Sequence, residues 1–155
     1  MKFSTCLAAL AVAGASAGPL AFNSTGMKLG TVVSCGGSGD IGSGLVAVLD
    51  PPAPCAGQSM TLSLDFTASR EVSRGTSIVS GSFSGIKLPS STNPLCTSEG
   101  GKVDCPIAAG ANHFDIPSDV PAGTPKGGQL IIQQQWVDAD TSETVICVAY
   151  LLATC

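Results

Sequence analysis

Charged and aromatic side chains are scarce in this sequence: charged residues make up 12% of it and aromatic residues 5%, with one tryptophan and one tyrosine. The seven basic residues are scattered and are outnumbered by eleven acidic ones. Because no basic stripe is available to neutralise a phosphate backbone, a nucleic-acid partner is excluded. The same scarcity argues against a polybasic membrane anchor, and the few aromatic rings offer a glycan little stacking surface.

Residues that usually perform catalysis or bind metals are also few. The single histidine, His113, has no Ser/His/Asp signature around it. Asp138 and Asp140 could act as a carboxylate pair, but residues 138–142 are better interpreted as a polar hairpin between two apolar strands. The glycine-rich run at 36–39 lacks the lysine of a phosphate-binding loop, and no Cys-x-x-Cys pair is present for zinc. We therefore predict that the protein is not an enzyme and has no catalytic residues, cofactor or metal site.

No apolar stretch reaches the roughly 20 residues that a membrane-spanning helix requires. The apolar run at residues 7–15 is short, follows Lys2 and ends at Ala15-Ser16-Ala17, the small-x-small pattern of signal-peptidase cleavage. We expect residues 1–17 to be a signal peptide; a buried N-terminal helix is the alternative. Residues 18–34 then form an N-terminal arm, in which Asn23 begins a glycosylation acceptor triplet.

Cysteine, in contrast, is plentiful. Of the seven cysteines, Cys6 falls in the expected signal peptide, which leaves six in the mature chain. An even number of cysteines in a secreted chain is typical of a disulfide framework. Spacing alone does not choose among the possible pairings.

Strand patterns dominate the rest of the chain. Residues 60–67 alternate apolar and polar side chains without a break, which places Met60, Leu62, Leu64 and Phe66 on one face. Clusters of proline and glycine separate this segment from other candidates, and no segment after the signal has convincing helical periodicity. The chain is therefore predicted to be all-β, a two-sheet antiparallel sandwich, with further strands at residues 44–49, 77–88, 113–116, 129–137 and 144–152.

A series of short motifs carries a family resemblance. In chain order they are Cys35-Gly36, Cys55-Ala56-Gly57-Gln58-Ser59, Cys96, Asp104-Cys105-Pro106-Ile107, Gly110, Asp119-Val120-Pro121-Ala122-Gly123, Trp136-Val137-Asp138 and Ile146-Cys147-Val148. Together they resemble the ML domain, the lipid-recognition sandwich of the Niemann–Pick type C sterol carrier, the fungal phosphatidylglycerol/phosphatidylinositol transfer proteins and the mite group 2 allergens. The resemblance implies an immunoglobulin-like β-sandwich over residues 35–155, with a lipid cavity between its sheets.

The resemblance also implies a disulfide pairing. Cys35 is similar to the family cysteine that pairs with the one in the last strand, here Cys147, and Cys96 with Cys105 matches the pair that closes a short loop. Of the third family pair only one position is filled, by Cys55, so its expected partner is the remaining cysteine, Cys155.

The lipid-lining positions are carried over in the same way. The resemblance places inward apolar side chains on four segments. It also places them on the proline-bracketed segment 116–121, at the mouth through which lipid enters the cavity. A closed sandwich core filled by the same residues is the alternative for each of them. The implied lipid-binding residues are Leu62, Leu64, Phe66, Val79, Phe83, Ile86, Leu88, Ile116, Val120, Leu130, Ile132 and Trp136.

Three departures from the sterol carrier, at Ser90, Val120 and Gln134, bear on the ligand. That protein has aromatic residues at the mouth positions matching Ser90 and Val120, which this chain lacks, and segments 51–54 and 120–123 are more similar to the fungal phospholipid-transfer branch. Gln134 takes the place of a family tryptophan, where it could meet a polar headgroup or form a cross-strand hydrogen bond.

The resulting expectation is a secreted, monomeric protein that binds a sterol or phospholipid, transfers it between membranes and contacts them transiently. It acts outside the cell or in a vacuolar, lysosome-like lumen. The alternative is a secreted sandwich with a closed core that recognises a protein or glycan partner.

Overall fold

A computed structural model describes residues 27–153 and 155. The predicted signal peptide, Cys6 and the Asn23 acceptor lie outside the described residues, as do residues 18–26 of the expected N-terminal arm. Within the described part of the chain, no helix is long and apolar enough to cross a membrane.

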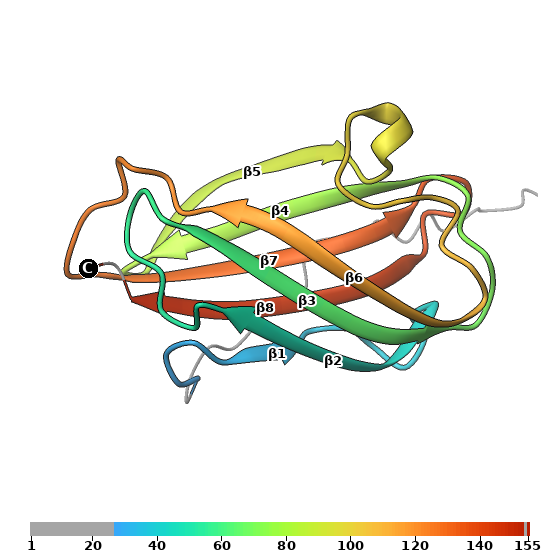
Figure 1. The fold of residues 1–155 in the computed structure, drawn as a ribbon, viewed down its shortest axis with the longest axis horizontal. Helices are drawn as coiled ribbons and strands as arrows, with labels where there is room; N and C mark the ends of the chain where they lie inside the picture. The colour runs from blue at the N-terminus through green and yellow to red at the C-terminus, as the bar shows by residue number, and fades with distance from the viewer. Residues whose placement is uncertain (1–26, 154) are drawn as a thin grey trace, which may run out of the picture.

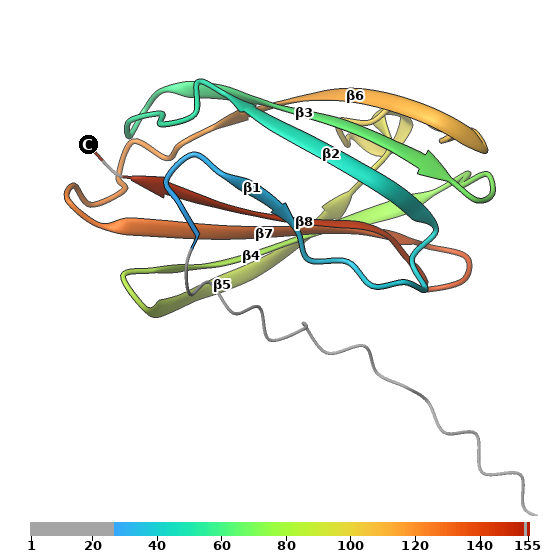
Figure 2. The same ribbon diagram turned by 90° about the horizontal axis from the view of Figure 1, so that it is seen from below.

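Two antiparallel sheets pack face to face (Figures 1 and 2), which confirms the predicted immunoglobulin-like sandwich. A short 3-10 helix, η1 (Thr97–Glu99), follows the last strand of the hairpin β4–β5. The five-stranded sheet has the order β1 (Val32–Ser34), β8 (Thr144–Ala153), β7 (Gln129–Asp138), β4 (Gly75–Phe83), β5 (Ile86–Pro94). The three-stranded sheet has the order β2 (Gly42–Asp50), β3 (Ser59–Ala68), β6 (Gly110–Asp119).

Strand β3 forms the centre of the smaller sheet, because its sequence alternates as a half-buried strand requires. Met60, Leu62, Leu64 and Phe66 are 3%, 1%, 0% and 3% exposed, and they face the other sheet as predicted. The residues between them, such as Ser63 and Asp65, point outward, and Asp65 pairs with His113 of β6. One side of β3 therefore supplies a continuous apolar surface to the core.

The predicted strand at residues 77–88 is two strands joined by a tight turn. Ser84 and Gly85 both have positive φ, 45° and 85°, as a two-residue hairpin turn requires. Pro89 and Pro117 lie within strands, in β5 and β6. Each of these strands pairs on one side only, and an edge strand accepts proline because its outer N–H has no partner in the sheet.

Aromatic rings fill the part of the core next to β3. Phe66 of β3, Phe114 of β6 and Trp136 of β7 pack at centroid distances of 5.7–6.2 Å, with the tryptophan ring edge-on to both phenylalanines. Edge-to-face packing of this kind adds to the stabilisation from burial. This cluster joins the two sheets and closes that part of the sandwich.

The structure contains the three disulfides implied by the resemblance. Cys35–Cys147 and Cys55–Cys155 each have a Cα–Cα distance of 5.0 Å, and Cys96–Cys105 has 5.4 Å. Cys55 lies between β2 and β3 and Cys155 follows β8, so this bond connects the two sheets. The sequence separation of 100 residues places it among the bridges that most restrict an unfolded chain.

Replacing Leu64 with alanine should lower the free energy of unfolding by about 2–5 kcal/mol, because it leaves a hole among well-packed neighbours. The matched control is Val46→Ala on β2, where the side chain is 59% exposed and the expected change is below about 0.5 kcal/mol. Urea unfolding followed by circular dichroism measures both. Equal effects of the two substitutions would contradict the assigned inward face of β3.

Candidate functional site

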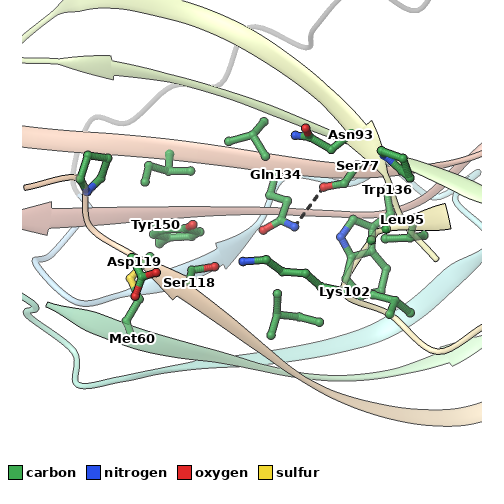
Figure 3. Close-up of a pocket in the computed structure, with 18 residues that line it drawn as sticks. Met60, Ser77, Asn93, Leu95, Lys102, Ser118, Asp119, Gln134, Trp136 and Tyr150 are labelled. Carbon is green, nitrogen blue, oxygen red and sulfur yellow. Dashed lines mark hydrogen bonds between the residues drawn. The ribbon is translucent and has the colours of Figure 1, made fainter. Parts of the chain in front are cut away.

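A cavity of about 480 Å3 lies between the sheets. Strands β4 and β7 form one wall, the ends of β3 and β6 form the other, and the segment 93–103 borders it (Figure 3). Its volume falls in the range of about 300–1,000 Å3 typical of small-molecule sites. Apolar side chains supply part of the lining: Met60, Val79, Leu95, Val103, Ile116, Ile132 and Trp136.

A second cavity of about 390 Å3 adjoins the first, and the two share Val79, Pro121 and Ile132 in their linings. It lies toward the turn between β4 and β5, against the loop that follows β6. Its lining is predominantly apolar and consists largely of Phe83, Leu88, Leu130, Ile132 and several prolines. The two cavities together extend from the middle of the sandwich to one end of it.

Polar side chains gather in the first cavity. The Gln134 amide donates a hydrogen bond to the Ser77 hydroxyl at 3.1 Å, drawn in Figure 3, and the Lys102 ammonium donates one to the Pro117 carbonyl of β6. Lys102 therefore reaches from the segment after η1 to the opposite sheet, across the edge where β5 and β6 face each other. Gln134 forms the cross-strand hydrogen bond considered for it and also lines the cavity.

Trp136 carries a donor that lacks a partner. Its side chain is 1% exposed, and its indole Nε1–H makes no hydrogen bond to any described residue. A buried polar group without a partner costs about 1–3 kcal/mol. Tyr150 also lines this cavity, and burial raises the pKa of its phenol to about 12, so it remains neutral.

Most of the sequence-predicted lipid residues line one of the two cavities. Val79, Ile116, Ile132 and Trp136 line the first, and Phe83, Leu88 and Leu130 join Val79 and Ile132 around the second. Leu62, Leu64 and Phe66 face between the sheets but line neither cavity, since they pack in the closed part of the core.

Three of the predicted positions require correction. Ile86 is 70% exposed, and it lies at the tip of the β4–β5 hairpin, next to the turn. Ile116 and Val120, placed near a mouth and away from the deep core, are only 3% and 2% exposed. Val120 is held inside by backbone hydrogen bonds with Gly57 and Gln58, which attach the end of β6 to the loop before β3.

Sequence reasoning missed the polar side of the cavity. Ser77 could have been found, since it shares strand parity with Val79. Ser118 could have been found in the same way, since it shares strand parity with Ile116 on β6, and Asn93 belongs to β5. Lys102 carries no such signal, because its position depends on how the segment after β5 folds back under the Cys96–Cys105 disulfide.

The candidate catalytic residues lie outside both cavities. Asp138 ends β7, is 2% exposed and forms an ion pair with Arg70 at 2.7 Å. Burial alone would raise the pKa of this carboxyl, but hydrogen bonds from the Asp140 N–H, Arg70 and Thr141 outweigh it and lower the pKa. Asp138 and Asp140 thus belong to a polar hairpin, as interpreted from sequence.

His113 lies on the outer face of the smaller sheet, 2.8 Å from Asp65. The hydrogen bond with Asp65 raises the pKa of its imidazole, and the charges of Asp65 and Asp115 act in the same direction. This exposed cross-strand contact has no access to the cavity lining.

Replacing Val120 with aspartate should destabilise the fold by about 3–5 kcal/mol, the cost of an uncompensated buried charge. The matched control is Asp119→Asn at the neighbouring exposed position, which should change stability far less. Denaturant unfolding measures both variants. A Val120→Asp protein of wild-type stability would show that this side chain reaches solvent.

Comparison with known proteins gives a consistent result. Residues 31–153 match the ML domain. A Dictyostelium discoideum protein, provisionally named a phosphatidylglycerol/phosphatidylinositol transfer protein, is 33% identical over 105 residues, which cover 65% of this chain and 74% of that protein.

Two solved structures share the fold. A Niemann–Pick type C2 protein from Japanese carpenter ant superposes with a TM-score of 0.59 at 18% identity, covering 81% of this chain and 99% of that one. Chicken MD-1 complexed with lipid IVa superposes with a TM-score of 0.58 at 16% identity, covering 77% and 85% of the two chains. Since the ML domain match spans nearly all of the described residues, this chain belongs to the ML-domain family.

Proposed function

We propose that this protein is a secreted lipid carrier that holds a sterol or the acyl chain of a phospholipid between its two sheets. The observation that carries the proposal is the pair of adjoining cavities between β4, β7 and β6. The names of the similar proteins support it, since they include a phosphatidylglycerol/phosphatidylinositol transfer protein and a protein complexed with lipid IVa. The three disulfides support an extracellular or lumenal location.

The energetics of exchange suit a carrier. Burying a 16-carbon chain contributes about 0.8 kcal/mol per methylene, or roughly 13 kcal/mol relative to water. A bilayer offers the chain nearly the same stabilisation, so movement between membrane and cavity is close to balanced. Transfer then needs no external source of energy, only a contact that spares the chain from crossing water.

One end of the sandwich is suited to transient membrane contact. The β4–β5 turn, the β6–β7 loop and the segment before β1 meet there (left in Figure 1), next to the second cavity. This end carries exposed Leu29, Ile86 and Leu88. Lys28, Lys87 and Lys126 are interleaved with them, and none of the three takes part in the ion pairs of the described residues. A bilayer with anionic headgroups complements such a surface.

Replacing Ile132 with tryptophan should weaken lipid binding, because the larger ring projects into the space that both cavities share. Excluding two methylenes, at about 0.8 kcal/mol each, corresponds to about tenfold weaker binding. The measurement is transfer of a fluorescent sterol and a fluorescent phospholipid between vesicles, with native mass spectrometry of the purified protein. The matched control is Ile131→Trp, since Ile131 lies on the outward face of the same strand.

Comparable loss of transfer in both variants would attribute the effect to general damage to the sheet. If the wild type binds neither lipid and carries none when purified, the carrier proposal is wrong. A binding module for a protein or glycan partner then takes its place.

Replacing Lys28, Lys87 and Lys126 together with glutamine should reduce binding to vesicles that contain phosphatidylglycerol, by about 1 kcal/mol for each lysine. Binding to neutral phosphatidylcholine vesicles should change little, and vesicle flotation measures both. The control is Arg74→Gln at the opposite end, where Arg74 pairs with Asp140. If Arg74→Gln weakens vesicle binding as much as each lysine substitution does, the effect comes from net charge. That result would contradict the placement of the contact surface at this end.

A further inference from the structure

We propose that Trp136, Gln134 and Lys102 form a polar subsite inside the first cavity that binds an anionic oxygen group of the lipid. The ligand chemistry is a phosphodiester or carboxylate oxygen attached to an apolar chain. This inference rests on the proposed carrier function and specifies the orientation in which the lipid is held.

Trp136 is the central observation. Its indole is 1% exposed and lines the cavity, and its Nε1–H has no acceptor among the described residues. Figure 3 shows the ring at the same end of the cavity as Ser77 and Gln134. Native proteins rarely leave a buried donor unpaired, so a ligand acceptor at this position supplies a physical reason for it.

Gln134 and Lys102 add donors to the lining of the same cavity. The Gln134 amide uses one N–H on Ser77 and the Lys102 ammonium uses one on the Pro117 carbonyl, which leaves further N–H groups on each. Lys102 is exposed at the rim and forms no ion pair among the described residues, so it brings a positive charge to the cavity lining without a protein counterion. An anionic acceptor is favoured there over a neutral one, since charge-assisted hydrogen bonds are the stronger kind.

One carboxylate also borders the cavity. Asp119 accepts a hydrogen bond from the Ser59 hydroxyl at 2.7 Å, and Figure 3 places it near Met60, at the opposite side of the cavity from Trp136. Asp119 already has a hydrogen-bond partner and lies on the other side of the cavity, so its negative charge does not oppose an anion at the Trp136 end.

The adjoining cavity sets the direction of the rest of the molecule. Its lining is mainly Phe83, Leu88, Leu130, Ile132 and prolines, which suits a hydrocarbon chain. A bound lipid therefore lies with its oxygen group near Trp136 and its chain directed toward the β4–β5 turn. The inward parity of Leu130, Ile132, Gln134 and Trp136 on β7 matches this order, apolar first and polar last.

The single tryptophan allows a direct test. In protein labelled with 15N-tryptophan, one indole signal reports the Nε1–H. Loading with phosphatidylglycerol should move the indole proton downfield, as expected for a new hydrogen bond, whereas loading with hexadecane should not. Native mass spectrometry verifies occupancy in each sample.

Matched variants test the side chains. Gln134→Leu and Lys102→Met should each weaken phosphatidylglycerol binding by about tenfold, in keeping with loss of a hydrogen bond to a charged group, and leave hexadecane binding unchanged. The control is Gln133→Leu, the adjacent residue on the outward face of β7, where the amide contacts the Cys147 sulfur. This control should bind both ligands as the wild type does.

Several results would overturn the subsite. Phosphatidylglycerol that occupies the cavity without moving the indole signal would do so while leaving the carrier function intact. A neutral sterol that binds as tightly and moves the signal equally would contradict the preference for an anion. If no lipid enters at all, the carrier function fails and the subsite fails with it.

Discussion

An apolar space between two sheets must remain open although the sheets gain free energy by closing on it. A dry cavity costs about 24 cal/mol per Å3, so the 480 Å3 between these sheets would cost on the order of 12 kcal/mol without contents. That is comparable with the entire stability of a domain of this size, about 5–15 kcal/mol. The remaining structure has to compensate for this opposing term.

Different parts of the sandwich compensate for the free-energy cost of the cavity in different ways. Around Leu62, Leu64 and Phe66 the sheets close completely, and the aromatic contacts with Trp136 join them. On the other side of Trp136 the sheets separate and polar groups enter the lining, so part of that space is compatible with water as well as with lipid. The Cys55–Cys155 bond connects the sheets at the end where no such closed core is present. Trp136 takes part in both regions, since its ring packs in the closed core and its side chain also lines the open one.

The sequence predicted the elements whose pattern is local. The unbroken alternation of β3 identified its buried face, and the apolar segments at 129–137 and 144–152 gave β7 and β8 nearly to the residue. The disulfide pairing followed from family resemblance, not from spacing. The predictions that failed concern positions set by contacts between distant segments. The burial of Val120 depends on the loop before β3, and the place of Lys102 in the cavity lining depends on a segment with no periodicity. The exposure of Ile86 was missed because the turn at Ser84 and Gly85, which places Ile86 at a hairpin tip, was not predicted within the segment 77–88.

The prolines within β5 and β6 have a consequence for how this molecule behaves among copies of itself. Both sheets end in unclosed edges, and an exposed strand edge invites a second chain to extend the sheet. Pro89 and Pro94 in β5 and Pro117 in β6 lack the N–H that an incoming strand would need. Beside a cavity that keeps its walls apart, these edges resist conversion into an intermolecular sheet. The space between the sheets can thus stay open without leaving these two edges available to a second chain.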